Sequence, residues 1–294
     1  MEKKFILRGL LAGAVAGLVA FVFARIFAEP LIGRAIDYEG ARGAAQEALD
    51  KAAGGLHVHG EEAEIFSRAV QADVGIGVGV IALGAAMGAL AAVVYVVCLG
   101  RVGRIRPRVL ALLVAGAGFA GFYLVPFLKY PANPPAIGHE DTIRDRSNLY
   151  LAMVACSIIL LILAVWLGRK LAVQYGNWNA TLLAGAGYIV VIGLIMWGLP
   201  SVGELAANVE AYGHQATETP LPLKDAEGTI VFPGFPADDL FQFRLYSLLA
   251  QALLWGCLGL AFGPMAERLL AREGLTTTPA ATGTGSAKPL AGTA

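Results

Sequence analysis

The chain has 294 residues, of which 57% are hydrophobic and only 15% are charged, and its 22 basic side chains balance its 22 acidic ones. Soluble domains carry roughly 25% charged residues, and here the charges gather between long apolar runs, so we expect an integral membrane protein. Without a long basic cluster to neutralise phosphates, nucleic-acid binding is not expected. The three cysteines each lie in an apolar run without C-x-x-C spacing, which indicates neither a disulfide scaffold nor a zinc knuckle.

Six apolar stretches approach the roughly 20 residues that a helix needs to cross a bilayer. They cover residues 5–28, 74–99, 109–128, 149–167, 178–199 and 245–262. No A-x-A cleavage site follows the first, so it is expected to be a retained span rather than a signal peptide. The sequence predicts an all-α polytopic membrane protein: a six-helix transmembrane bundle with irregular and partly helical outer loops over residues 1–270, then a disordered cytoplasmic tail, 271–294.

The charged residues favour one orientation in the membrane. The segments on the side of the N-terminus carry a net charge of +9 and comprise residues 1–8, 100–108, 168–178 and 264–294. The opposite segments carry a net charge of −10 and comprise residues 29–73, 129–148 and 200–244. Because short loops rich in lysine and arginine stay inside, both termini are expected in the cytoplasm of a plasma (inner) membrane protein. The outer face is then acidic and would raise the local cation concentration.

Small residues and prolines indicate how the chain packs. Glycines recur at four-residue spacing in the first two spans, which predicts close helix packing in lipid: Gly9, Gly13, Gly17, Gly75, Gly79, Gly84 and Gly88. In the first outer loop, residues 40–53 and 61–71 are expected to be helical, with a break at Gly54. In the second, four prolines between Pro126 and Pro135 predict a stiff, extended, non-helical path.

All four histidines fall in expected outer loops. His57 and His59 would share one face of an extended segment, next to an acidic cluster, and imidazoles with carboxylates suit divalent cobalt, nickel or zinc. His139 is held on the proline-rich segment, which would limit the ordering entropy lost on binding. The candidate metal ligands are His57, His59, Asp73, His139 and Asp141. The alternative is that they are ordinary solvated side chains.

Ionisable and polar groups at the membrane boundary form a second candidate set, because they are costly in apolar surroundings unless they pair or line a wet path. The candidate permeation path comprises Arg25, Glu29, Lys129, Asn179, Arg244 and Gln251. The alternative for the first two is a structural ion pair, since they are four residues apart. No central carboxylate supports a proton relay, and without G-x-S-x-G or H-E-x-x-H an enzyme or a permanently bound cofactor is not expected.

Several pieces of the chain resemble one family over nearly its whole length, to about Leu270. They are the glycine-rich stretch 8–17, Glu29-Pro30, residues 36–39, the proline segment 126–135, residues 177–180 and the stretch 235–244. The family is that of the CbtA cobalt transporter subunits. The resemblance implies cobalt uptake for cobalamin synthesis, a partner resembling CbtB with one span and a histidine-rich terminus, and five spans where we count six. It supplies no ligand set.

Two functions from different classes remain. The first is a membrane permease subunit for a divalent transition metal, cobalt by resemblance, with a homo-oligomer as a further partner hypothesis. The second is a non-transporting structural or assembly subunit that binds other membrane proteins through its glycine faces. A transporter should have a polar cavity joining the boundary residues, whereas a scaffold should be dry between its helices.

Overall fold

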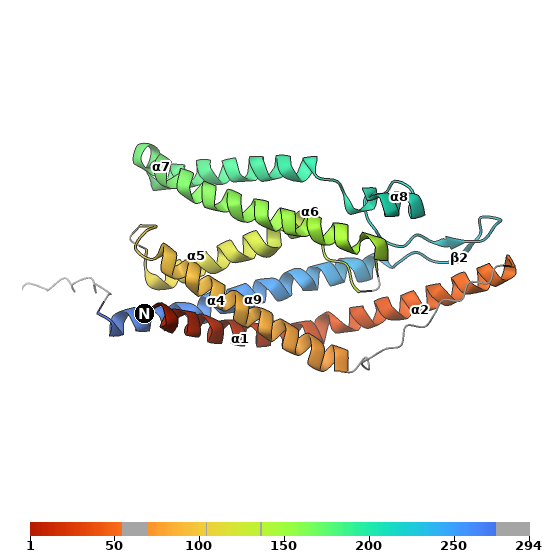
Figure 1. Ribbon diagram of the computed structural model, residues 1–294, viewed down its shortest axis with the longest axis horizontal. Coiled ribbons are helices and arrows are strands. Elements are labelled where there is room, and N and C mark those ends of the chain that lie inside the picture. The colour runs from red at the N-terminus through yellow and green to blue at the C-terminus, as the bar shows by residue number, and fades with distance from the viewer. Residues whose placement is uncertain (55–69, 104, 136, 275–294) are drawn as a thin grey trace, which may run out of the picture.

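The computed structural model describes residues 1–54, 70–103, 105–135 and 137–274, and most of them are helical (Figure 1). The helices are α1 (Glu2–Phe27), α2 (Glu29–Ala52), α4 (Ile76–Cys98), α5 (Pro107–Gly118), α6 (Val125–Lys129), α7 (Ile143–Gly198), α8 (Ala206–Tyr212) and α9 (Ala237–Arg272). The short elements are the π-helices η1 (Gln71–Gly75) and η2 (Phe119–Leu124), the 3-10 turns η3 (Glu140–Thr142) and η4 (Val202–Glu204), and strands β1 (Leu223–Lys224) and β2 (Ile230–Phe232).

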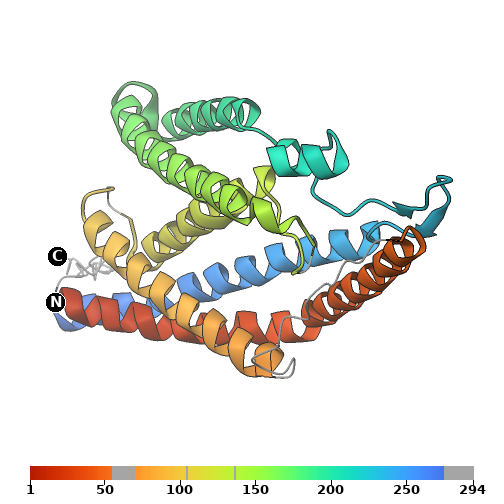
Figure 2. The same ribbon diagram turned by 45° about the vertical axis from the view of Figure 1, so that its right-hand side comes forward.

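Within the described residues, five helical stretches are long and apolar enough to cross a membrane, which confirms an all-α polytopic membrane protein. The fourth of them contains α7, and α7 is a hairpin. Gly176 has φ 73° and ψ 164°, outside the helical region, and the chain reverses there (Figures 1 and 2). Only glycine adopts this conformation without strain. The two halves of the hairpin pack side by side, with a hydrogen bond of 2.8 Å between the hydroxyls of Ser157 and Tyr188.

The closest helix pair is α1 with α4, and glycines line the contact. A Cβ atom placed on Gly84 would lie 2.5 Å from the carbonyl oxygen of Gly13, and one on Gly17 would lie 2.8 Å from the carbonyl oxygen of Val80. Gly9 and Gly88 face each other in the same way. The expected small-residue packing is therefore present, although two of the seven glycines take no part: Gly75 and Gly79 have no close neighbour from another helix.

A four-helix core forms around this pair from α1, α4, α5 and α9. Aromatic rings join its members, since Tyr95 of α4 lies 5.7 Å from Phe5 of α1 and 5.2 Å from Phe262 of α9, between ring centroids. Trp255 of α9 packs against Gly118 of α5, where no side chain would fit. The α7 hairpin stands outside this core, packs on η2, α6 and η3, and is the least buried of the candidate spans.

The third span changes its helical form partway, where α5 passes into η2 and then α6. Pro126 lies in the first turn of α6, so the expectation that this proline excludes a helix is wrong at this position. Proline has no N–H to offer the carbonyl four residues earlier, that of Phe122. Tyr150 of α7 donates a hydrogen bond of 3.2 Å to this carbonyl. The hydroxyl thus gives this carbonyl a side-chain donor close to the proline.

The connecting segments gather at two ends of the molecule (Figures 1 and 2). We call one the acidic end; it holds α2, residues 130–142 and residues 200–236. The basic end holds the start of α1, residues 99–106, the α7 reversal and the end of α9. The helix expected over 40–53 begins earlier, because α2 follows α1 almost directly at Glu29. Residues 55–69, which include all but the last two residues of the second expected outer helix, and the tail from 275 lie outside the described residues.

Gly13→Leu is expected to destabilise the protein by about 3 kcal/mol, the upper end of the usual cost of overpacking, because the new side chain would meet backbone that cannot move aside. Gly79→Leu is the matched control: it has the same gain in helix propensity, but open space around the new side chain. Thermal unfolding of the purified protein in detergent measures both. Equal melting temperatures for the two variants would contradict the close approach of α1 and α4.

Candidate functional site

The proline-rich segment at the acidic end is tied to the helices on either side of it. The Lys129 ammonium donates a hydrogen bond of 2.8 Å to the carbonyl of Leu199, just past the end of α7, where the helix leaves carbonyls unpaired. The Tyr130 hydroxyl donates to the neighbouring carbonyl of Pro200 at 2.9 Å. Both residues therefore fasten the start of the segment to the end of the α7 hairpin.

Arg244 of α9 holds the middle of the same segment. Its guanidinium donates to the Asn133 side-chain oxygen at 2.8 Å and to the Ala132 carbonyl at 3.3 Å. Two of the stretches that carry the family resemblance, 126–135 and 235–244, thus meet here. Lys129 and Arg244, both expected in a permeation path, each donate to main-chain or amide oxygens here.

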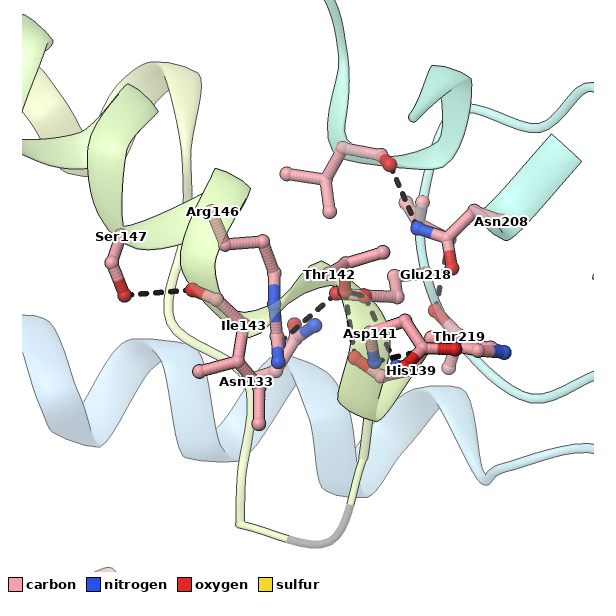
Figure 3. A network of polar contacts seen from close by, with 12 residues as sticks. Asn133, His139, Asp141, Thr142, Ile143, Arg146, Ser147, Asn208, Glu218 and Thr219 are labelled. Carbon is pink, nitrogen blue, oxygen red and sulfur yellow. Dashed lines mark hydrogen bonds and ion pairs between the residues drawn. The ribbon is translucent and has the colours of Figure 1, made fainter. Parts of the chain in front are cut away.

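A buried carboxylate closes the other end of the segment (Figure 3). The Glu218 side chain is fully buried, and its Oε2 atom pairs with Nη1 of Arg146 at 3.0 Å. Its Oε1 atom accepts the backbone N–H of His139 at 3.0 Å. The Thr142 hydroxyl reaches both Glu218 Oε1 and the His139 carbonyl, and its single proton serves one of them at a time. Glu218 thereby joins residues 213–219 to the proline segment and to the start of α7.

His139 and Asp141, two of the expected metal ligands, come together at this junction. The backbone N–H of Asp141 donates to His139 Nδ1 at 3.3 Å, and the Asp141 carboxylate lies 3.7 Å from the same nitrogen. The His139 ring packs edge-on against Tyr212 of α8, with 6.1 Å between centroids. The imidazole is about three-quarters buried, whereas the Asp141 side chain is 81% exposed and free to reorient.

Helix α2 is fastened to this end by a small apolar cluster formed by Ala35, Ile137 and Phe235, with Tyr38 packed against it. Tyr38 also donates a hydrogen bond of 2.9 Å to the Pro233 carbonyl. One turn of α2 carries Tyr38 and Glu39, and Glu39 lies near Glu140. Although Glu39 is exposed, partial desolvation of its carboxylate, and secondly the negative charge of Glu140, raise its pKa above the usual value.

The remaining expected ligands and path residues lie elsewhere. Asp73 in η1 forms an ion pair of 2.6 Å with Arg25. The arginine of α1 therefore reaches a residue far away in sequence, in addition to Glu29, the partner expected four residues along the chain. Glu29 also attracts this guanidinium. Asn179 is exposed and follows the α7 reversal, which both views place at the basic end. Gln251 is half-buried in the middle of α9. His57 and His59 lie outside the described residues.

The interior between the helices offers apolar cavities. One of them measures about 160 Å³ and is lined by side chains and glycines of α4, α5, η2, α7 and α9, without a charged residue among them. Within residues 1–54, 70–103, 105–135 and 137–274, no group of three or more histidine, cysteine, aspartate or glutamate side chains is placed to hold a metal ion.

Sequence reasoning missed the roles of Glu218 and Arg146. Glu218 is one of seven acidic residues between 200 and 244, and nothing in its spacing distinguishes this fully buried residue from the other six. Its flanking threonines and proline were a weak signal of an ordered segment.

Glu218→Gln is expected to destabilise the protein by about 3 kcal/mol, the lower end for a broken buried ion pair because Arg146 keeps some contact with water. Arg146→Gln should cost a similar amount, and the double variant less than the sum of both. Glu210→Gln, at an exposed position of the same segment, is the control. Additive losses in thermal unfolding would contradict direct coupling of the two charges.

Glu39→Gln is expected to stabilise the protein at neutral pH. A raised pKa in the folded protein means that the stability contributed by protonated Glu39 is complete below its unfolded pKa, near 4.3, and is lost as the pH rises through the folded value. The advantage of the variant should therefore vanish below about pH 4. Unfolding measured across pH, beside Asp37→Asn on the same helix, tests this. An advantage independent of pH would contradict it.

Comparison with known proteins identifies the chain at the level of family. The family described as "Probable cobalt transporter subunit (CbtA)" matches residues 2–267. No curated protein and no solved structure matches the chain. The match covers α1 to most of α9 and includes every contact of the proline segment described above. The chain belongs to the CbtA family of cobalt transporter subunits.

Proposed function

We propose that this chain is the permease subunit of a membrane complex that takes up cobalt for cobalamin synthesis. The observation that carries the proposal is the family match over residues 2–267, which covers nearly all of the described protein. A subunit needs partners, and the resemblance points to a small one-span subunit with a histidine-rich terminus. The cobalt ion is cargo in this proposal, and the chain holds no permanent cofactor.

The proposed topology has six membrane crossings with both termini in the cytoplasm of the inner membrane. It is supported by the reversal of α7 at Gly176, which divides 56 residues into two helices that each approach the length needed to cross. It is also supported by the separation of charge, because the arginine-rich segment between α4 and α5 lies at the end opposite α2.

The proposed uptake begins at the acidic end, with His139 and Asp141 as ligands beside His57, His59 and Asp73. His139 stands on a segment that Lys129, Arg244 and Glu218 hold in place, so its imidazole loses little freedom on binding a cation. Asp141 is exposed and can turn toward the same cation. Asp73 would have to break its ion pair with Arg25 before it could bind a cation.

The second candidate is a structural or assembly subunit without a path of its own. The apolar lining of the interior cavities favours it, because a cation crossing between these helices would find no polar partner there. In the permease proposal, a partner subunit or a second copy of this chain would therefore complete the polar path. The residues of this chain that would line its part of the path are Arg25, Glu29, Lys129, Asn179, Arg244 and Gln251.

Cobalt accumulation in a host without other cobalt importers distinguishes the two candidates. Cells would express the chain with and without its proposed partner, beside a His57→Ala, His59→Ala, His139→Ala triple variant at equal membrane abundance. The permease proposal predicts uptake that falls tenfold or more in the triple variant, as for lost metal ligands. His214→Ala is the matched control, because His214 lies at the same end but pairs with Glu204 at 2.8 Å. Folded protein without uptake in either configuration would favour the assembly subunit.

A further inference from the structure

The apolar cavity lies between the α7 hairpin and the core. Val94 of α4, Val114 and Ala117 of α5, Ile158 and Ile162 of α7 and Trp255 of α9 are among its lining residues. A dry cavity of about 150 Å³ is known to admit benzene, so 160 Å³ is enough for a slender apolar group. One turn of a helix with its side chains fills roughly 400–600 Å³, which is too much for this space.

Basic side chains lie at the end of the helices that border the cavity. Arg101 and Arg106 belong to the connection between α4 and α5, while Arg169 and Lys170 precede the α7 reversal, and all four are exposed. Both views place these segments at the basic end, one on the α7 hairpin and the other on the α4–α5 pair (Figures 1 and 2). Within the part of the chain that the structure describes, none of the four forms an ion pair, in contrast to Arg108, which binds Glu267.

The spacing between these cations and the cavity matches a lipid. Eight residues separate Ile162 from Lys170 and Arg106 from Val114, which corresponds to about 12 Å along each helix. Half of the hydrocarbon thickness of a bilayer is about 15 Å. Lys170 also lies 4.2 Å from the centroid of the Trp166 ring, an aromatic and basic pair typical of the membrane interface. The cavity is therefore at the depth of the acyl chain when the cations are at the depth of the phosphates.

We propose that an anionic phospholipid binds between α7 and the α4–α5 pair, with an acyl chain in this cavity and its phosphate beside Arg106 and Lys170. The apolar cavity is too small for a helix but admits part of an acyl chain, and the cations select a negatively charged head group. Such a lipid would cover the weakly buried inner side of α7. The proposal is independent of cobalt transport.

Quenching of Trp255 fluorescence by brominated lipid tests the proposal. The other three tryptophans are exposed, so Trp166→Phe, Trp178→Phe and Trp197→Phe leave Trp255, 4% exposed, as the reporter and keep an aromatic ring under Lys170. The protein is reconstituted in phosphatidylcholine vesicles containing a minor fraction of brominated phosphatidylglycerol or brominated phosphatidylcholine. We expect the brominated phosphatidylglycerol to associate at least fivefold more strongly, since each lysine or arginine near an anionic surface contributes about that factor.

Two variants and two matched controls locate the lipid. Arg106→Gln with Lys170→Gln should bring the preference for phosphatidylglycerol close to one, whereas Arg268→Gln with Arg272→Gln, at the same end on α9, should retain it. Ala117→Leu, which fills the cavity, should reduce quenching by both lipids, whereas Ala155→Leu, on an exposed face of α7, should not.

Several outcomes would overturn the proposal: equal quenching by the two lipids in the parent protein, a preference that survives loss of Arg106 and Lys170, or no effect of Ala117→Leu. A co-purifying membrane protein that shields Trp255 from both lipids would assign the cavity to a protein segment instead. An unchanged Trp255 emission maximum and a single elution peak would show that each variant is folded.

Discussion

The close approach of α1 and α4 is the contact on which the rest of the structure depends. In lipid, burying an apolar side chain against another helix brings little advantage over leaving it against acyl chains, so helices associate where their backbones can approach. Gly9, Gly13 and Gly17 allow this approach to Gly84 and Gly88. The pair then presents Phe5 and Tyr95 as one surface for α9, and α5 packs on α9 in turn. The core thus forms around a contact made by residues without side chains.

Unpaired backbone groups impose the second constraint, and it shapes the acidic end. Prolines prevent the segment after α6 from forming a helix, so its main-chain groups need other partners. Side chains from distant parts of the chain supply them: Arg244 from α9 and Glu218 from the segment before β1. Lys129 and Tyr130 do the same for the end of α7. These contacts hold His139 on a rigid support, which is what its proposed role as a metal ligand requires.

The two ends of the molecule differ in charge and in the contacts that their segments make, and both differences are consistent with the proposed uptake from the acidic end. At the acidic end, Glu218 joins the proline segment to α7, and the cluster of Ala35, Ile137 and Phe235 joins α2 to the same segment. At the basic end, exposed cations lie on the α7 hairpin and on the connection between α4 and α5. A cation would be attracted to the first end and an anionic head group to the second. The hairpin α7 touches both regions, since its two ends join the ordered network and its reversal lies among the cations.

The sequence by itself determined the class of the protein and the approximate limits of its helices, because a run of about 20 apolar residues has few stable forms in lipid other than a helix. It also indicated the glycine contact and the non-helical proline segment. Local spacing could not decide which groups meet. Arg25 pairs with Asp73 although Glu29 lies four residues away, Gly79 is exposed although Gly84 and Gly88 are packed, and Glu218 alone of its acidic neighbours is fully buried with a cation. Each of these outcomes depends on how the helices cross and where the chain reverses, and those are set by contacts between residues far apart in sequence, so only the tertiary structure decided them.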